Sequence, residues 1–179
     1  MLQCNDEIAV NRKVCKIIKL LGHGKGGYSY LAEYNNSLVV LKQIHHEPCS
    51  YYTFGNKIEA EINDYKRLCD AGINIPEMID VDIANERIIK EYIDGELISE
   101  LVKAGKVKDE YFAQVRHMAK LAYDAGLNID YYPTNFIVNK NHNDVEELFY
   151  IDYECNNYMD EWSFEKWGIT HWMNQSLPK

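Results

Sequence analysis

The sequence predicts an α+β protein built from two lobes. Residues 14–44 are dominated by apolar runs of strand type, and one helical pattern follows at residues 57–70. The second half instead begins with helical patterns and ends with a small hairpin and a tail. Strands followed by helices are typical of the α+β class, and a cleft between two lobes is a common place for a ligand site.

The composition is that of an ordinary soluble globular protein, because 46% of the 179 residues are apolar and 26% are charged. The formal net charge of -9 argues against a nucleic-acid partner, whose backbone requires a basic face. A bound polyphosphate needs only a few local positive groups. No early apolar run resembles a signal peptide and none is long enough to span a membrane, so we expect a cytoplasmic protein without a membrane partner.

Five cysteines are scattered along the chain without any C-x-x-C pair: Cys4, Cys15, Cys49, Cys69 and Cys155. An odd and scattered set predicts reduced thiols rather than a disulfide framework. The run His45-His46-Glu47, followed by Cys49, contains residue types that bind metals, but no closing ligands stand nearby in the sequence. Because metal sites demand specific ligand spacing, we interpret this run as an exposed loop.

Three strands are expected within residues 14–44, formed by "VCKIIKLL", "YSYLAEY" and "SLVVLKQI". Asn35-Asn36 should join the last two as a hairpin, because asparagine tolerates the left-handed backbone of a tight turn. Residues 57–70 carry apolar side chains at helical spacing, and Gly72 is a natural stop. A second hairpin is expected in "EMIDVDI" and "RIIKEYI", turning at Ala84-Asn85.

In the second half, helices are expected at residues 96–103 and 109–125. One face of the longer helix is apolar and consists of Tyr111, Val115, Met118 and Ala122. The segments "NFIV" and "LFYID" read as two short strands, and residues 160–174 as a helical tail. The tail contains all three tryptophans, Trp162, Trp167 and Trp172, which we expect to pack against the second lobe.

The glycines Gly22, Gly24 and Gly27 form a G-x-G-x-x-G pattern. A glycine-rich turn lets backbone N–H groups approach phosphate oxygens, although glycines also occur in plain turns. A dinucleotide-binding turn must lead from a strand into a helix. Here the following "YSYLAEY" is of strand type, so the sequence predicts a strand–turn–strand loop, the kind that covers ATP in protein kinases.

Lys42 ends the apolar strand "VVLK", where a buried ammonium group requires an anionic partner. Strand alternation does not decide whether this lysine points inward. Two acids of the next helix are candidate partners, Glu59 and Glu61. Glu61 falls about 50° from the centre of the apolar stripe and Glu59 more than about 100° away, so Glu61 is the better candidate.

The segment "DYYPTN" places Asp130 five residues before Asn135, and Asp152 follows in "FYIDYE". In phosphoryl transfer one carboxylate orients the attacking hydroxyl, while a second carboxylate and an amide hold Mg²⁺ against the phosphates. The two short strands would bring Asn135 and Asp152 together at the open end of their hairpin. Taken singly, each of these residues could equally belong to an ordinary turn.

In order and spacing, these motifs over residues 15–155 resemble the protein-kinase-like superfamily. The resemblance implies a bilobal α+β fold, with a β-rich N-lobe at residues 1–90 and a truncated helical C-lobe at residues 91–179, forming one kinase-like domain. The segments "IDYE" and "DYYPTN" are similar to those of aminoglycoside phosphotransferases and choline kinases. Only 27 residues (153–179) follow Asp152, which resembles RIO-like and other minimal atypical kinases of bacterial type.

The resemblance also implies a role for each matching residue, with ATP and Mg²⁺ as cofactors. The glycine loop would cover the phosphates, and Lys42, paired with Glu61, would contact the α- and β-phosphates. Backbone groups from Glu91 to Ile93 would bind adenine. Asp130 would be the catalytic base, and Asn135 and Asp152 would bind Mg²⁺.

Some positions depart from the family pattern. Asn128 stands where a histidine often precedes the catalytic aspartate, Tyr132 replaces a lysine, and D-F-G reads Asp152-Tyr153-Glu154. Positioning of the γ-phosphate is then in doubt, and Lys25 in the glycine loop is a candidate substitute.

We therefore expect a kinase whose hydroxyl acceptor is a protein serine or threonine, with a protein partner as one source of the missing substrate platform. The alternatives are a small-molecule kinase and a pseudokinase that binds nucleotide or acts as a scaffold.

Overall fold

The computed structural model describes residues 1–48, 55–141 and 143–173. The chain divides into two compact units, the first built from Met1–Ile62 and Pro76–Tyr92, the second from Asn63–Ile75 and the chain from Ile93 onward. The expected lobe boundary at residue 90 lies close to one of these divisions. Residues 63–75, however, group with the second unit although the sequence-based division placed them in the N-lobe.

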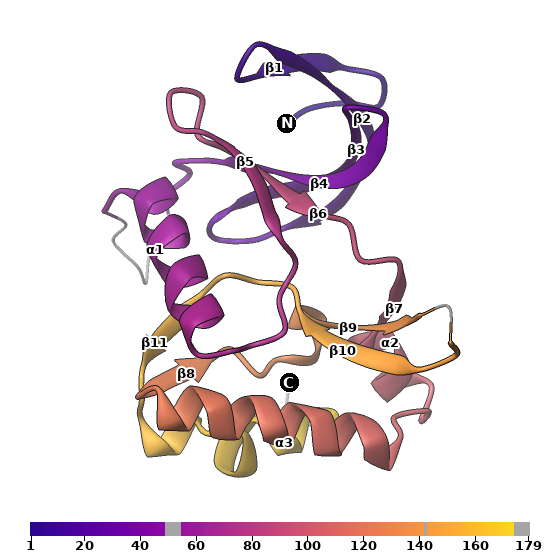
Figure 1. The fold of residues 1–179 in the computed structure, drawn as a ribbon, viewed down its shortest axis with the longest axis vertical. Helices are drawn as coiled ribbons and strands as arrows, with labels where there is room; N and C mark the ends of the chain where they lie inside the picture. The colour runs from indigo at the N-terminus through magenta and orange to yellow at the C-terminus, as the bar shows by residue number, and fades with distance from the viewer. Residues whose placement is uncertain (49–54, 142, 174–179) are drawn as a thin grey trace. The chain divides into compact units, whose positions relative to one another are not determined.

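The first unit is built on a curled antiparallel sheet of six strands in the order β1-β2-β3-β4-β6-β5, shown in Figure 1. The strands are β1 (Glu7–Val10), β2 (Lys13–His23), β3 (Gly27–Tyr34), β4 (Ser37–Ile44), β5 (Met78–Asp82) and β6 (Arg87–Glu91). One face covers an apolar core that includes Ile17, Tyr30 and Leu41. The three strands expected in residues 14–44 are confirmed, whereas β1 was not anticipated.

Both expected hairpins of this sheet are present. Asn35 and Asn36 connect β3 to β4 with φ of 52° and 60°, the left-handed backbone that a two-residue turn requires. Residues 83–86 connect β5 to β6, and Glu86 takes the left-handed conformation there with φ of 53°. Turn chemistry therefore set the register of the first hairpin, as the sequence predicted.

Helix α1 (Lys57–Asp70) has the bounds that the sequence predicted. Gly72 follows it with φ of 77°, a conformation that suits glycine after a helix end. The helix contributes Lys57–Ile62 to the first unit and its remaining residues to the second. Ile58 and Leu68 are its most deeply buried side chains.

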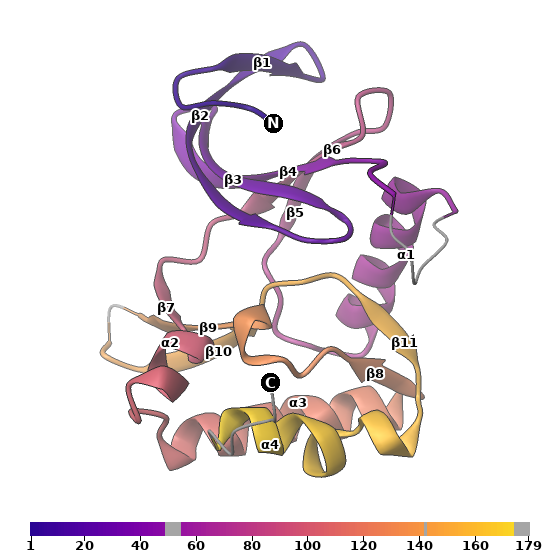
Figure 2. The ribbon, with the colours of Figure 1, turned by 180° about the vertical axis from the view of Figure 1, so that it is seen from behind.

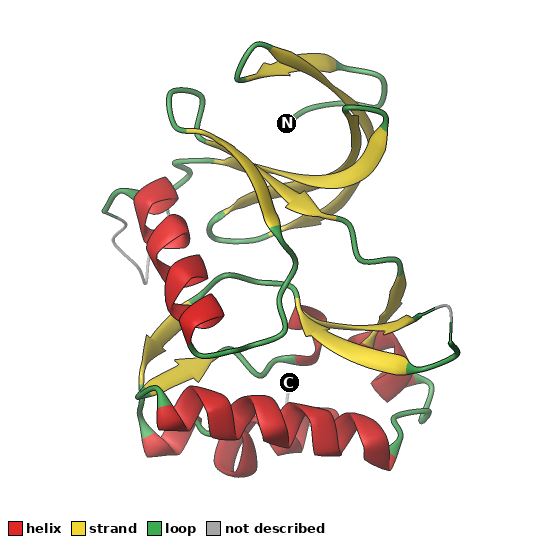
Figure 3. Ribbon diagram, in the orientation of Figure 1, coloured by secondary structure: helices red, strands yellow, loops and turns green. Residues whose placement is uncertain are grey.

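The second unit contains two small sheets and most of the helical residues, as Figure 3 shows. Its first sheet has the order β10-β9-β7 and its second pairs β11 with β8. The elements are β7 (Gly95–Leu97), α2 (Ile98–Lys103), α3 (Asp109–Asp124), β8 (Leu127–Ile129), β9 (Phe136–Lys140), β10 (Glu146–Tyr150) and β11 (Cys155–Asn157). The β9–β10 hairpin and both helices were expected, while the three-residue strands were not.

The core of the second unit is formed mainly by α3, the small sheets and the tail. The buried face of α3 consists of Tyr111, Val115, Met118 and Ala122, as its periodicity predicted. The tail comprises a 3₁₀ turn (Asp160–Trp162), a π-helical turn (Phe164–Gly168) and α4 (Ile169–Trp172), and residue 174 of the expected helix lies outside the described residues.

The tryptophans of the tail differ in burial. Trp172 is 1% exposed and contacts Phe136 and Phe164, so its expected packing is confirmed. Trp162 is 49% exposed and lies against Trp167, with ring centroids 5.6 Å apart, so it is a surface residue of the second unit and not part of its buried core. Across the described parts of the chain, no helix is both long and apolar enough to cross a membrane.

Candidate active site

The glycine-rich segment forms a strand–turn–strand hairpin between β2 and β3, visible in Figure 2. The Gly24 N–H donates to the Gly27 carbonyl at 3.0 Å and closes the turn. A Cβ at Gly27 would lie 2.5 Å from the Gln43 carbonyl oxygen, so close strand packing alone requires this glycine. Apart from their own chain neighbours, no atom of the described residues lies within 4 Å of the Cβ position at Gly22 or Gly24, so neither position is filled by packing.

Lys42 of β4 forms an ion pair with Glu61 of α1. Both side chains are largely buried, with exposed fractions of 12% and 14%, whereas Glu59 is exposed. The angle from the apolar stripe of the helix therefore identified Glu61 correctly as the acid that pairs with Lys42. The second carboxylate oxygen of Glu61 is buried and has no hydrogen-bond partner among the described residues, so only one side of the carboxylate is compensated.

Gly26 lies directly against this ion pair. A Cβ at Gly26 would be 3.4 Å from Lys42 Nζ and 3.5 Å from Glu61 Oε1. The turn between β2 and β3 thus approaches the lysine with backbone rather than side chain. Gly26 stands outside the G-x-G-x-x-G spacing, and for that reason sequence reasoning missed it.

Lys57, at the start of α1, holds the glycine turn from the other side. Its ammonium group donates to the Lys25 carbonyl at 3.1 Å and to the His45 carbonyl at 2.5 Å, and the residue is 5% exposed. Carbonyl oxygens at these distances compensate the buried charge and fix the turn relative to the chain after β4. No sequence signal distinguishes Lys57 from a surface lysine, because its partners are remote backbone atoms.

The segment expected to bind adenine follows β6. The Glu91 N–H donates to the Glu77 carbonyl at 2.9 Å, so any hydrogen bond of Glu91 to adenine would use its carbonyl oxygen. Ile93 begins the next stretch of the second unit, and its side chain is buried.

In the second unit, Asp130 and Asn135 lie on one loop between β8 and β9. The Asp130 carboxylate accepts the Tyr132 N–H at 3.0 Å, which fixes the side chain in a local turn. Asn135 donates its side-chain N–H to the Asp130 carbonyl at 3.3 Å. The available lone pairs of an amide are on its oxygen, so Oδ1 is the atom that Asn135 can offer to a cation.

Asp152 lies beside Asn135, as the hairpin predicted. Phe136 and Tyr150 form the last pair of β9 and β10, and the Ile151 N–H then donates to the Asn135 carbonyl at 2.9 Å. The Asp152 carboxylate also accepts the Tyr153 N–H at 2.8 Å. An amide oxygen and a carboxylate are hard ligands, so this donor set fits Mg²⁺, which binds few protein groups and keeps several waters.

Tyr150 connects the Asp130 loop with the segment that follows β10 from inside the core. Its hydroxyl donates to the Glu154 carbonyl at 2.8 Å and accepts the Asp130 N–H at 3.3 Å. Burial, and then the charge of Asp152, raise the pKa of Tyr150 well above its usual range, so the hydroxyl stays protonated. Sequence reasoning counted this tyrosine only as a strand residue.

The tail supports the same loop. Trp172 donates its indole N–H to the Tyr131 carbonyl at 2.9 Å. Gly168 packs so closely that a Cβ there would lie 2.6 Å from Tyr131 Cβ. His171 contacts Tyr132, and burial lowers its pKa while the Asp130 charge opposes that shift.

Solved structures identify the architecture. The chain is similar to the crystal structure of the BubR1 kinase domain, with a TM-score of 0.59 and 20% identity. The alignment covers 89% of this chain and 53% of that one. The chain has a protein-kinase-like fold. Within this kinase-like fold, the first unit holds Lys42, Glu61 and the glycine hairpin, and the second holds Asp130, Asn135 and Asp152.

One curated protein also matches part of this kinase-like chain. It is described as a probable bifunctional tRNA threonylcarbamoyladenosine biosynthesis protein of Methanococcus vannielii and is 29% identical over 92 residues. The match covers 51% of this chain and only 15% of that protein. No family model matches the chain.

The loop after β4 departs from expectation. His45 and Glu47 have a neighbour in His23 of β2, and the ligand atoms of the three side chains lie within 4.8 Å of one another. The run is a largely exposed loop, as the sequence predicted, but His23, which stands 22 positions before His45, reaches it through the sheet and was not anticipated. His46 instead pairs with Glu86, and Cys49 lies outside the described residues.

Proposed function

We propose that the chain is an ATP- and Mg²⁺-dependent phosphotransferase that transfers the γ-phosphate to a hydroxyl group. The observation that carries the proposal is the largely buried Lys42–Glu61 ion pair with Gly26 against it, in a chain of kinase-like fold. A largely buried lysine that a glutamate holds in place can direct its ammonium group at the phosphate oxygens of a nucleotide. The open glycine turn beside it offers backbone N–H groups to phosphates.

In this proposal each cluster has a distinct task in the reaction. The first unit binds: Lys42 holds the α- and β-phosphates, with Gly22, Gly24, Gly27 and Lys25 around them. Glu61 keeps the lysine in place. Backbone groups from Glu91 to Ile93 bind adenine.

The second unit performs the transfer. Asp130 accepts the proton of the acceptor hydroxyl as that oxygen attacks the γ-phosphorus. Asn135 and Asp152 hold Mg²⁺, which neutralises phosphate charge when bound. Tyr150 and Trp172 position the loop through its backbone and do not touch the reacting atoms.

A serine or threonine hydroxyl of a protein is the acceptor that we propose first. The Asp152-Tyr153-Glu154 sequence, which resembles small-molecule kinases, favours a small hydroxyl compound as the second candidate. Purified protein incubated with γ-labelled ATP, alone and with a general protein acceptor, separates these cases. Label on protein supports the first, while label only on an added alcohol such as an aminoglycoside or choline supports the second.

The decisive variant is Asp130→Ala. We expect it to abolish labelling while ATP with Mg²⁺ still raises the melting temperature, because ligand at about a hundredfold over Kd stabilises by about 3 kcal/mol. Asp70→Ala, an exposed aspartate, is the matched control and should keep full activity. Turnover retained in Asp130→Ala would assign the base to another residue. Wild-type protein that neither binds nor consumes ATP would contradict the proposal.

The archaeal relative supports one further candidate, participation in tRNA threonylcarbamoyladenosine biosynthesis. Its support is the 92-residue match, which covers 51% of this chain. The net charge of -9 argues that such a role would not depend on a broad basic tRNA-binding face. Measuring the modified nucleoside in tRNA from cells with and without the gene tests it, and unchanged levels would remove this candidate.

A further inference from the structure

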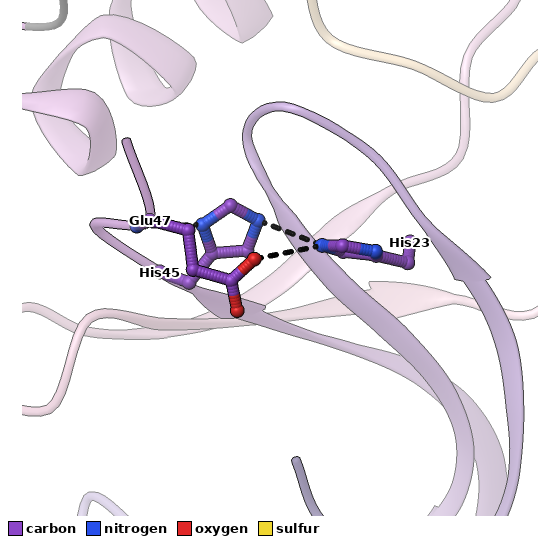
Figure 4. A group of neighbouring side chains, drawn as sticks. All are labelled: His23, His45 and Glu47. Carbon is purple, nitrogen blue, oxygen red and sulfur yellow. Dashed lines mark hydrogen bonds and ion pairs between the residues drawn. The ribbon is translucent and has the colours of Figure 1, made fainter. Parts of the chain in front are cut away.

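Three metal-ligand side chains converge beside the glycine hairpin. His23 ends β2, and His45 and Glu47 follow β4. Figure 4 shows the imidazole of His45 and the carboxylate of Glu47 directed toward the imidazole of His23. All three residues belong to the first unit, and the side chains of His23 and Glu47 are about half exposed.

The separations between these atoms match those of a tetrahedral metal site. His23 Nε2 lies 3.2 Å from His45 Nε2 and 3.4 Å from Glu47 Oε2. Ligand atoms about 2.0–2.1 Å from zinc in a tetrahedron are about 3.3 Å apart. Two of the three edges therefore already have the required length.

No placement of ring protons on the two imidazoles turns every close contact in this cluster into a hydrogen bond. His45 Nε2 also lies 2.9 Å from the Gly24 carbonyl, so that oxygen requires an N–H on His45. Glu47 likewise requires an N–H on His23 Nε2, because an ionised carboxylate only accepts. With both nitrogens protonated, two N–H groups face each other at 3.2 Å. A dication that receives a lone pair from each nitrogen and from the carboxylate removes this conflict.

Tyr28 of β3 supports two of the three ligands. Its ring stacks on the His23 imidazole, with centroids 4.2 Å apart and planes within 7°. Its hydroxyl donates to Glu47 Oε1 at 2.5 Å, and the other carboxylate oxygen is the one directed at His23. In metal centres, residues that do not touch the metal commonly orient its ligands and hydrogen-bond to the ligand atom that faces away from the metal.

We propose that His23, His45 and Glu47 bind a divalent transition metal, Zn²⁺ in the first place, with the fourth position open to solvent. Two imidazoles and one carboxylate suit Zn²⁺ and are too rich in nitrogen for Mg²⁺. Binding through His45 Nε2 moves the ring proton to Nδ1. That exchanges two hydrogen bonds, the one from the Glu47 N–H to Nδ1 at 3.2 Å and the one from Nε2 to the Gly24 carbonyl at 2.9 Å, for a metal–nitrogen bond.

The metal would tie the end of β2 to the chain after β4. Lys57 already joins these segments by donating to the carbonyls of Lys25 and His45, so the ligand backbones are held before metal arrives. Metal binding at these side chains requires neither nucleotide binding nor phosphoryl transfer. It adds a further fixed point to a hairpin whose turn is held by the hydrogen bond between the Gly24 N–H and the Gly27 carbonyl and by Lys57.

Calorimetric titration of the full chain with Zn²⁺, at a pH where imidazoles are neutral, tests the proposal. We expect one site per chain, and at least tenfold weaker binding in His23→Gln and in Glu47→Gln. His46→Gln, whose imidazole pairs with Glu86 outside the cluster, is the matched control and should bind as the wild type does. Equal affinity in the wild type and His23→Gln would overturn the proposal.

Cysteines are competing zinc ligands, so Co²⁺ serves as the spectroscopic probe. We expect ligand-field bands of a four-coordinate site without a thiolate-to-cobalt charge-transfer band, and their loss in His23→Gln. A thiolate band in the wild type would place the metal on cysteines and overturn the assignment. Tyr28→Phe keeps the stacked ring but loses the hydrogen bond to Glu47, and should weaken Zn²⁺ binding about tenfold or more.

Discussion

The Lys42–Glu61 pair joins a strand and a helix of the first unit through one contact between two largely buried side chains. A helix arc computed from sequence placed Glu61 inward and Glu59 outward, and the structure confirms that choice. Alternation along the strand could not orient Lys42. Gly26, Lys57 and His23 were missed, because the significance of each depends on atoms remote in sequence and not on local spacing.

At the residue scale, we predict that replacing Lys42 alone destabilises the protein more than replacing Lys42 and Glu61 together. Lys42→Met leaves a buried carboxylate without its cation and should lower the free energy of unfolding by about 3 kcal/mol. Lys42→Met combined with Glu61→Leu removes both charges and should recover most of that loss. Urea denaturation of the single and double variants measures the coupling, and additive losses would show that the pair contributes no interaction energy.

The same single substitution should also affect the proposed chemistry. Lys42→Ala is expected to weaken ATP binding and turnover together, since the lysine is proposed to hold the phosphates in both ground and transition states. Thermal shift with ATP and the labelled-ATP assay give the two readouts. An unchanged variant would mean that Lys42 does not contact the nucleotide.

At the scale of elements, the long and periodic segments were predictable and the short ones were not. Helix α1 and the face of α3 follow directly from apolar spacing. Strands β8 and β11 have three residues each and exist only because remote segments pair, with Cys155 opposite Ile129. In β7, a Cβ at Gly95 would overlap the Val138 carbonyl oxygen. The sequence around Gly95 does not predict this close approach of two strands.

The tail shows the same dependence on packing, which leads to a prediction for Gly168. Its π-helical turn brings the backbone against Tyr131, and an added Cβ would lie 2.6 Å from Tyr131 Cβ and 2.8 Å from a Phe164 ring atom. Gly168→Ala should therefore cost about 1–3 kcal/mol through overpacking. It should also reduce phosphoryl transfer, because Tyr131 follows Asp130.

Gly55→Ala provides the control for that variant. Gly55 is exposed and, apart from its own chain neighbours, has no atom of residues 1–48, 55–141 and 143–173 within 4 Å of its Cβ position, so this substitution should leave the free energy of unfolding within about 0.5 kcal/mol of the wild type. Denaturation curves for both variants decide the matter, and equal stability would show that the tail shifts freely away from the loop.

At the scale of the whole molecule, two buried thiols should make the folded protein less stable as the pH rises into the alkaline range. Burial raises the pKa of Cys15 from 9.0 to about 11 and that of Cys155 to about 12. The unfolded chain loses these protons first, so the unfolded state binds fewer protons and stability falls as pH rises above 9. Cys15 alone should account for about 2 kcal/mol of this loss by pH 11.

Melting temperatures across that pH range test the effect. Cys15→Ala should be less stable at neutral pH because it loses packing, yet its stability should decline less steeply between pH 9 and 11. Cys4→Ala removes an exposed thiol and should follow the wild-type slope. Parallel slopes in all three proteins would assign alkaline sensitivity to other groups.

Neither compact unit is one continuous stretch of chain, which has a consequence for biosynthesis. Leu68 and Ile73 belong to the apolar core of the second unit, but they leave the ribosome before β5 and β6 complete the first sheet. A nascent chain that has reached Glu91 can close that sheet while these two side chains still await nearly all of their core neighbours. The growing polypeptide therefore still exposes the apolar segment with Leu68 and Ile73 when the first sheet closes. That segment is the part of the nascent chain that a chaperone would protect.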